Sequence, residues 1–152
     1  MSMLNEWRGQ AAAVGAVDRG AILLLARELY TERRRRSRYF DADLFGEPSW
    51  DILLDLYIAA CEDRRVPTTS ACIGAHVPPT TALRWLRLLE ARGLVEREHD
   101  GRDGRRTFVG LSARGMEAME AFLGSTRAKL LLELATFAEA EAIAAVERHA
   151  AE

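Results

Sequence analysis

One stretch, residues 78–111, constrains the fold of this chain more than any other, because its hydrophobic period changes partway along it. Through residues 79–92 the apolar side chains recur at three- and four-residue spacing, which gives a helix one buried side. From residue 94 onward apolar and polar residues alternate, stop at a charged loop and then resume, which is typical of a β-hairpin. The sequence therefore predicts a helix that runs directly into a hairpin with a polar tip.

The chemistry of its end residues bounds the predicted helix. Pro79 suits the first helical position, because its missing N–H would have no partner there, and Gly93 can take the left-handed conformation that ends a helix. The side expected to be buried consists of four apolar residues, Ala82, Trp85, Leu86 and Leu89. The side expected to be free carries Thr80, Thr81, Leu83, Arg84 and Arg87.

The predicted hairpin joins strands at residues 94–98 and 107–111 through a loop at residues 99–106. This loop holds two Gly, two Asp and three Arg, so it is too polar to bury and projects into solvent or onto a charged partner. Asp100 or Asp103 is close enough in sequence to hold a neighbouring Arg side chain by a charge-assisted hydrogen bond.

The order of motifs is more specific than any one of them. A helix, a turn and a second helix ending in Leu-Glu-Ala-Arg-Gly-Leu-Val precede a hairpin tip Asp-x-x-Asp-x-Arg-Arg, and Leu-Ser-x-x-Gly then opens another helix. This order, over roughly residues 50–122, resembles the winged helix-turn-helix of MarR-type transcriptional regulators. The resemblance implies that residues 79–92 form a major-groove recognition helix and that Arg102, Arg105 and Arg106 belong to a DNA-contacting wing.

The flanking helices are more apolar than a small winged core requires. Asp18 is the expected N-cap of a helix to about Tyr39, and Ser112 is the expected N-cap of a long C-terminal helix with a bend considered at residues 124–126. Their apolar surface predicts a partner. Because the terminal helices of MarR-type subunits intertwine, the resemblance implies a homodimer with two recognition helices about 34 Å apart on a near-palindromic DNA site.

We therefore expect a mostly α-helical fold with a small β-hairpin wing and with N- and C-terminal dimerisation helices. Residues 1–17 are expected to form a mobile arm, and residues 18–152 a single winged-helix domain. Within it, residues 18–45 and 112–152 would serve dimerisation, and residues 46–111 would form the DNA-binding core.

Inside that core, the first expected helix spans residues 50–61, with Ser49 as its cap and a buried side made of Ile52, Leu53, Leu56, Tyr57 and Ala60. A short helix then runs to Ala75. It begins with Thr68, Thr69 and Ser70, whose hydroxyls either contact the DNA backbone or act as ordinary helix caps.

Charge is distributed unevenly along the chain. The net charge of the whole chain is −2, but residues 64–115 carry +5 between flanks of −3 and −4. A basic segment on an acidic body is typical of a protein that reads double-stranded DNA. The sequence has no Gly-rich phosphate loop, HExxH or GxSxG motif, so we expect no enzyme. The alternative function is a winged-helix protein-interaction or assembly module.

Each candidate DNA contact has an alternative. Arg84 can bond guanine O6 and N7, or contact a phosphate, or pair with Glu90 on the surface. Thr80 and Thr81 can bond base edges or touch a thymine methyl group. Leu83 departs from the small polar residue usual in the family, and is either a reader of thymine methyl groups or simply exposed. For the wing, we prefer minor-groove contact to a flexible, solvated turn because its Arg residues share the basic segment.

The other basic and metal-binding candidates favour structural interpretations. For the run of Arg at residues 33–38 we prefer a solvated, partly ion-paired surface to a DNA contact, because consecutive Arg point all round a helix. Cys61, Cys72 and His76 lack the spacing of a zinc site, so we expect no metal or other cofactor, and both cysteines suit buried positions.

Two expectations concern location and ligands. No apolar run is long enough to cross a membrane, and two cysteines without a secretory segment suggest a cytoplasmic protein. MarR-type relatives often bind a small aromatic effector between the dimer helices and the winged domain. The residues considered for such a pocket are Tyr30, Tyr39, Phe40, Phe45 and Tyr57, although aromatic residues are more often part of a core.

Overall fold

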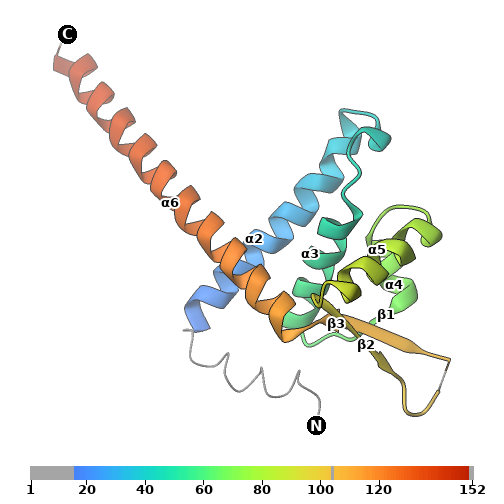
Figure 1. Cartoon of the computed structure of the whole chain (residues 1–152). Helices are drawn as coiled ribbons and strands as arrows, with labels where there is room; N and C mark the ends of the chain where they lie inside the picture. Colours follow the sequence, from blue (N-terminus) through green and yellow to red (C-terminus); the bar gives the residue numbers. More distant parts are fainter. Residues whose placement is uncertain (1–15, 104, 151–152) are drawn as a thin grey trace.

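The computed structural model describes residues 16–103 and 105–150 of the chain, without the side chains of residues 16–18. It is mostly helical, with one small antiparallel sheet (Figure 1). The α-helices, 3-10 helices (η) and strands follow in this order: α2 (Ala16–Arg35), η2 (Arg36–Arg38), η3 (Ala42–Leu44), α3 (Pro48–Cys61), β1 (Val66–Pro67), α4 (Thr68–Gly74), α5 (Pro79–Ala91), β2 (Val95–His99), β3 (Thr107–Leu111) and α6 (Ala113–Ala150).

Helix α2 differs from its prediction at both ends. It begins at Ala16, so Asp18 is not its N-cap, and it ends at Arg35, after which the chain tightens into η2. The arm expected at residues 1–17 lies outside the described residues, apart from its last two, which belong to α2.

Helix α3 is the centre of the core and is buried on more sides than the sequence pattern suggested. It packs against α2, α4, α5, α6 and β3. Leu54 and Ala59 are buried in addition to the expected Ile52, Leu56 and Tyr57. A helix surrounded by neighbours needs no polar stripe, which is why a one-sided pattern underestimated its burial. Ser49 is not its cap, because the helix already begins at Pro48.

The sheet has the strand order β1-β3-β2, with every pair antiparallel. In the hairpin Val95 lies opposite Leu111, and Arg97 opposite Val109. Strand β1, which pairs Val66 with Val109, was not predicted. A strand of two residues is too short to show a period, so only tertiary pairing reveals it.

Helix α6 starts with the predicted cap and continues unbroken to Ala150. The Ser112 Oγ accepts a hydrogen bond from the N–H of Gly115 at 3.0 Å and donates one to the carbonyl of Gly93 at 2.6 Å. Gly115 is needed here, because an added Cβ would lie 2.0 Å from the carbonyl oxygen of Leu94. The start of α6 is therefore fixed against the end of the proposed recognition helix.

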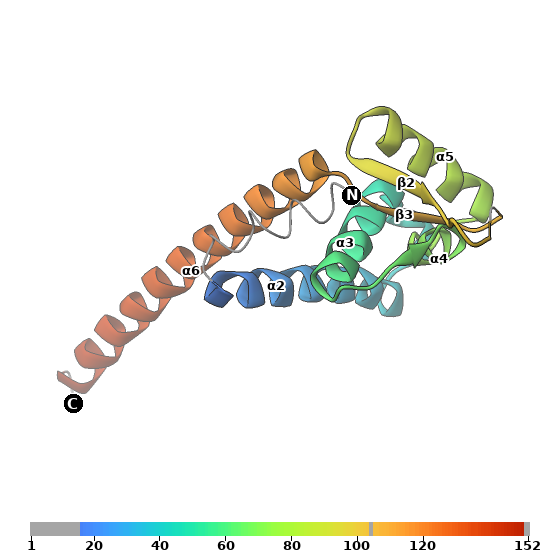
Figure 2. The ribbon, with the colours of Figure 1, turned by 90° about the horizontal axis from the view of Figure 1, so that it is seen from below.

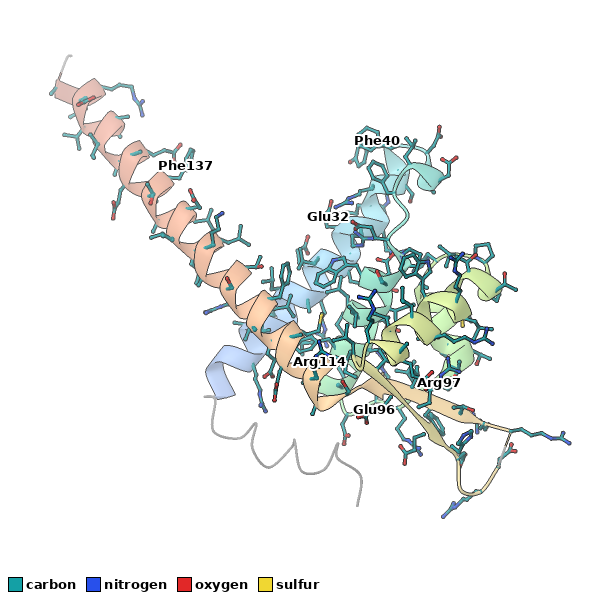
Figure 3. The ribbon with its side chains drawn as sticks, viewed as in Figure 1. Glu32, Phe40, Glu96, Arg97, Arg114 and Phe137 are labelled. Atoms are coloured by element: carbon teal, nitrogen blue, oxygen red, sulfur yellow. The ribbon has the colours of Figure 1, made fainter. Side chains whose placement is uncertain are left out.

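Two parts of α6 have different surroundings. The inner part, residues 113–123, buries Met116, Met119 and Leu123 in the core. The outer part, residues 124–150, diverges from α2 (Figure 1 and Figure 2). Its large apolar side chains, Phe137 among them, are 48–70% exposed (Figure 3). In the part of the chain that the structure describes, no helix is both long and apolar enough to cross a membrane.

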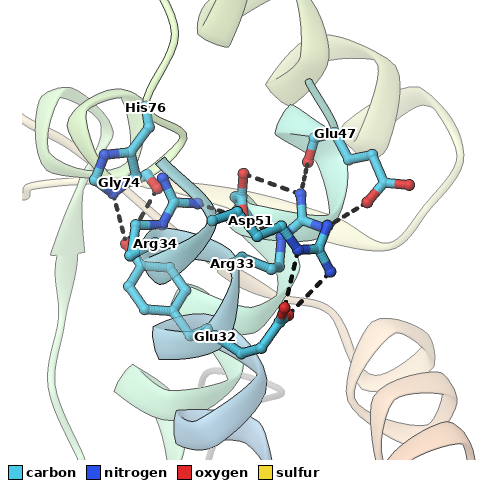
Figure 4. A network of polar contacts seen from close by, with 9 residues as sticks. Glu32, Arg33, Arg34, Glu47, Asp51, Gly74 and His76 are labelled. Atoms are coloured by element: carbon cyan, nitrogen blue, oxygen red, sulfur yellow. Dashed lines mark hydrogen bonds and ion pairs between the residues drawn. The ribbon is translucent and has the colours of Figure 1, made fainter. Parts of the chain in front are cut away.

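The Arg run at residues 33–38 is ion-paired rather than freely solvated. The Arg33 side chain is only 7% exposed; it bonds Asp51 at 2.6 Å and also pairs with Glu47 (Figure 4). Arg34 pairs with the same Asp51 carboxylate at 2.6 Å. Arg33 and Arg34 therefore join the end of α2 to the start of α3, whereas Arg35 and Arg36 pair with Glu28 and Glu32 of α2 itself. These ion pairs favour the structural interpretation over a DNA contact.

Candidate nucleic-acid interface

Helix α5 has one buried and one exposed side. Ala82, Leu86 and Leu89 are buried as the spacing predicted, but Trp85, the fourth residue expected on that side, is only half-buried against the core. Pro79 occupies the start of the helix, and Gly93 takes a φ of +69° just beyond its end. The carbonyl of Arg92, at that end, accepts a hydrogen bond from Arg114 of α6 at 3.0 Å. The helix is thus held at its C-terminal end and along one side, which leaves the opposite side accessible.

The accessible side of α5 is narrower than the sequence suggested. Thr80, Arg84 and Arg87 are exposed, and their spacing of four and three residues places them on one face. Thr81 is half-buried, and Leu83 is half-buried against the core. The expectation of a fully free Leu83 was therefore wrong, since this side chain lies at the edge where the helix meets its neighbours.

The alternative ion pair of Arg84 does not form. Glu90, considered as its partner, instead pairs with Arg97 of β2 at 3.0 Å. Within residues 16–103 and 105–150, the Arg84 guanidinium makes neither a hydrogen bond nor an ion pair. It is available to an acceptor outside the chain.

The hairpin projects beside α4 and α5, on the side of the molecule away from outer α6 (Figure 1 and Figure 2). Its tip is closed by a hydrogen bond from the N–H of Asp100 to the carbonyl of Arg106 at 2.9 Å. Arg102, Arg105 and Arg106 are all exposed there. The structure therefore presents three guanidinium groups at the end of a stiff support.

The two loop aspartates act on the backbone and not on guanidinium groups. Asp100 Oδ1 accepts the N–H of Arg102, and Asp103 Oδ1 accepts the N–H of Arg105, each at 3.1 Å. This is the usual way in which Asp stabilises a turn two residues ahead. The expectation that an aspartate would bond an Arg guanidinium was wrong, because both aspartates bond backbone N–H groups instead. The same two residues nevertheless hold the loop.

The hydroxyl residues at the start of α4 do not act alike. Thr68 donates its Oγ1 hydrogen to the carbonyl of Thr107 on β3 at 3.0 Å, and α4 has no side-chain cap. Ordinary capping by Thr68 was therefore a wrong interpretation, because the hydroxyl ties the short helix to the sheet. Thr69 and Ser70 are exposed.

Of the aromatic residues considered for an effector pocket, only Phe40 and Phe45 come together, with ring centroids 5.6 Å apart. Tyr57 is fully buried in the core, whereas Tyr39 and Phe40 are exposed beyond the end of α2. A cleft of about 790 Å³ lies between the end of α2, the segment around η3 and the turn between α4 and α5. Phe45 lines this cleft, but the other four aromatic residues do not.

The cysteines were only partly assigned correctly. Cys72 is buried, and burial raises the pKa of its thiol above the ordinary value. Cys61 is exposed at the end of α3, where a buried position was expected. In the described part of the chain, no group of three His, Cys, Asp or Glu side chains is arranged to hold a metal ion.

Sequence reasoning missed Tyr30, Gly74 and His76 as contributors to this region. They meet at the turn between α4 and α5, just ahead of the exposed side of α5. The left-handed backbone of His76, with a φ of +53°, leaves no local signature when the residue is not glycine. These contacts join residues more than 40 positions apart, so no periodicity could indicate them.

Comparisons with known proteins identify the fold. A MepR mutant from a multidrug-resistant S. aureus clinical isolate aligns with a TM-score of 0.50 and 23% identity, covering 74% of this chain and 77% of its own. A S. aureus MepR mutant bound to an oligodeoxyribonucleotide aligns with a TM-score of 0.51 and 20% identity, covering 73% and 74%. The fold is the MarR-type winged helix. It confirms the mostly helical winged helix-turn-helix expected from the sequence, whereas the dimerisation role of the terminal helices stays a prediction.

Sequence comparisons do not extend this result. No protein-family model matches the chain, and a search of curated proteins finds no match. At these levels of identity the MarR-type structures establish the fold, and the chemistry must be argued from the residues of this chain.

Proposed function

We propose that this chain is a DNA-binding transcriptional regulator that binds a near-palindromic duplex site as a homodimer. The observation that carries the proposal is the exposed face of α5, with Thr80, Arg84 and Arg87, beside an Arg-bearing hairpin tip. Both lie in the segment of charge +5, so phosphate attraction would bring this face to DNA in preference to the acidic remainder.

In this proposal α5 enters the major groove and the wing follows the backbone. Arg84 reads a base through two hydrogen bonds, because its guanidinium has no partner within the described residues. Thr80 and Arg87 contact neighbouring bases or phosphates from the same face. The half-buried Thr81 and Leu83 act at the margin of the helix.

The wing and α4 would contribute mainly affinity. Arg102, Arg105 and Arg106 are exposed on a loop whose backbone is fixed by Asp100 and Asp103. Arg side chains at such a tip fit a narrow minor groove. Thr69 and Ser70 provide exposed hydroxyls for the DNA backbone, while Thr68 positions them through β3.

Outer α6 supports the homodimer. Its exposed apolar residues lie on several sides of the helix: Leu130, Leu131, Leu132, Leu134, Phe137, Ile143 and Val146. A helix that is apolar on several sides is normally enclosed by more than one other helix. At 38 residues α6 is roughly 57 Å long, so a second copy has ample length to intertwine with it.

The DNA-binding part of the proposal is supported by a protein of related fold, since a MepR mutant is bound to an oligodeoxyribonucleotide.

The proposal includes a cytoplasmic location and a small-molecule effector that binds in the cleft lined by Phe45. A small molecule in the cleft beside Phe45 would contact both the end of α2 and the turn ahead of α5. A thermal-shift screen of aromatic acids and amines tests this part of the proposal separately, with Phe45→Ala as the variant expected to lose any shift.

The decisive experiment selects bound duplexes from a random library and then titrates the winner and a scrambled duplex across a salt series. We expect an enriched near-palindrome that binds at least ~1000-fold more tightly than the scrambled duplex. Weak binding without enrichment at every salt concentration contradicts the proposal and favours the protein-interaction module.

Three variants assign the residues within that experiment. Arg84→Ala should relax the preference at one position of each half-site, at a cost of ~1–3 kcal/mol. Arg102→Ala with Arg105→Ala should weaken all duplexes alike and flatten the salt dependence. Arg92→Ala is the matched control, because Arg92 is also exposed but lies at the other end of α5. Unchanged base preference for Arg84→Ala would remove its reading role.

A further inference from the structure

Tyr30 of α2 makes two polar contacts with the turn between α4 and α5. Its hydroxyl donates to the carbonyl of Gly74 at 3.2 Å and lies 3.2 Å from Nε2 of His76 (Figure 4). The two rings are tilted by 55°, with centroids 6.2 Å apart. A side chain on a helix outside the helix-turn-helix thus contacts both the last residue of α4 and the turn that follows it.

The hydrogens of these contacts can be assigned. The Gly74 carbonyl can only accept, so the single hydroxyl hydrogen of Tyr30 goes to it. The contact with His76 then requires a hydrogen on Nε2, which donates to the tyrosine oxygen. Removing the hydroxyl therefore takes this partner away from both the carbonyl of Gly74 and the N–H of His76.

The backbone conformation of His76 suggests that this position is occupied by histidine for its side chain. His76 follows the end of α4 with a φ of +53°, a conformation that glycine adopts most easily after a helix. A histidine there costs more than a glycine would, and its imidazole supplies the donor that glycine lacks. The side chain at this position therefore does more than end a helix.

Gly74 and Tyr30 are each also positioned by other residues of the core. A Cβ added at Gly74 would lie 2.9 Å from the Asp55 carboxylate, so the end of α4 already touches α3. The Arg34 guanidinium lies 5.1 Å from the centre of the Tyr30 ring and pairs with Asp51 at 2.6 Å (Figure 4). The tyrosine ring is thereby fixed by the same network that fixes the end of α2.

The link from His76 to α5 is short and stiff. Only Val77 and Pro78 separate His76 from Pro79, the first residue of α5. Two successive prolines restrict the backbone, so an orientation set at His76 is transmitted to the start of the helix. The exposed face of α5 begins at the next residue, Thr80.

We propose that Tyr30 and His76 form a latch that sets the orientation of α5. Tyr30 is then a positioning residue for DNA reading, although it lies on α2, a helix expected to serve dimerisation. This inference rests on the proposed function. It also adds a direct polar link between α2 and the turn ahead of α5, beside the packing of both helices against α3.

The test compares Tyr30→Phe with Tyr39→Phe, which removes the same hydroxyl from a tyrosine that is 79% exposed. We expect Tyr30→Phe to bind the selected duplex about three- to tenfold more weakly, with binding to the scrambled duplex unchanged, as loss of one hydrogen-bond pair allows. Tyr39→Phe should match the wild type. A merely structural role would lower both affinities together with the melting temperature, and that result overturns the latch.

Hydrogen exchange of the free protein provides a readout that needs no DNA. The hydrogen-bonded amides on either side of the turn, those of Ala75, His76 and Ala82, should exchange about three- to tenfold faster in Tyr30→Phe than in the wild type or Tyr39→Phe. His76→Asn, which tolerates the same backbone, should act like Tyr30→Phe, and the double variant should be no worse than either. Unchanged exchange and unchanged selectivity overturn the latch. A wild-type protein that selects no duplex overturns the proposed function, and exchange then decides whether the latch holds the turn.

Discussion

Inner and outer α6 are both rich in apolar residues, but only inner α6 is covered by the rest of the chain. Met116, Met119 and Leu123 are buried in the core, whereas Leu134 and Phe137 are each 64% exposed. The winged core ends where inner α6 ends, so the apolar side chains beyond that point are left exposed by the residues that the structure describes. Inner α6 thus belongs to the core of its own protomer. By our proposal, outer α6 forms a second core together with another copy of the chain.

The largest expected effect comes from outer α6. Leu134→Glu with Phe137→Glu should weaken dimerisation at least ~100-fold, because burying each of these side chains contributes about 1.5–3 kcal/mol. Sedimentation equilibrium over a concentration series measures the change. Ile73→Glu, a charge placed on an exposed apolar residue of α4, should leave association unaltered. A wild type that is monomeric at all concentrations would contradict the role given to outer α6.

The second effect tests the close contact of inner α6. Gly115→Ala should lower the free energy of unfolding by about 1–3 kcal/mol or more, because its Cβ would enter the Leu94 carbonyl. Gly124→Ala is the matched substitution in outer α6, where an added Cβ would meet no other described residue within 4 Å beyond its own helix backbone, and it should raise stability by up to ~1 kcal/mol. Urea unfolding compares the two. Equal effects would mean that the two parts of α6 do not differ in packing.

The third effect concerns the helix start. Ser112→Ala removes the cap of Gly115 and the donor to Gly93, and should cost about 0.5–2 kcal/mol of unfolding free energy. Ser125→Ala, on the exposed outer part, should change stability by less than about 0.5 kcal/mol. The difference between the two melting curves gives the value of the cap. Two superimposable curves would show that the Ser112 cap does not stabilise the fold.

The smallest effect is a pH dependence that belongs to the winged core. Burial and the nearby Arg34 guanidinium lower the pKa of His76 below its ordinary 6.5, although Asp51 and Asp55 act in the opposite direction. The folded state therefore favours neutral imidazole, and the stability it contributes is present above pH 6.5 and lost as the pH falls through the lowered pKa. Urea unfolding between pH 7.5 and 5 should show this loss in the wild type and not in His76→Asn. Parallel profiles would exclude His76 as its source.

Local chemistry made the proposed recognition helix and the hairpin predictable. Pro79, Gly93 and the three- and four-residue spacing act over a few positions, and the structure has the helix at Pro79–Ala91. The hairpin follows from alternation and from its turn residues, and its return strand agrees with the prediction. Ser112 was identifiable as a cap for the same reason, since its partner is three residues away.

Features that depend on distant neighbours were not predictable. Tyr30 appeared only as a candidate pocket residue, because its partners Gly74 and His76 lie more than 40 residues along the chain. Leu83 looked free on a helical projection, but the elements around α5 partly cover it. Thr68 looked like a cap until β3 supplied a carbonyl for its hydroxyl.

The sequence by itself determined the order from α5 through the hairpin to α6, the start of α5 at Pro79, the cap of α6 at Ser112, and the basic segment that points to DNA. Each of these depends on the spacing of residues, on backbone preferences of Pro and Gly, or on counted charge. Only the tertiary structure decided which faces are covered, that Arg33 is buried between two carboxylates, and that Tyr30 contacts the turn ahead of α5. Those outcomes depend on which distant surfaces meet, and no local pattern encodes that choice.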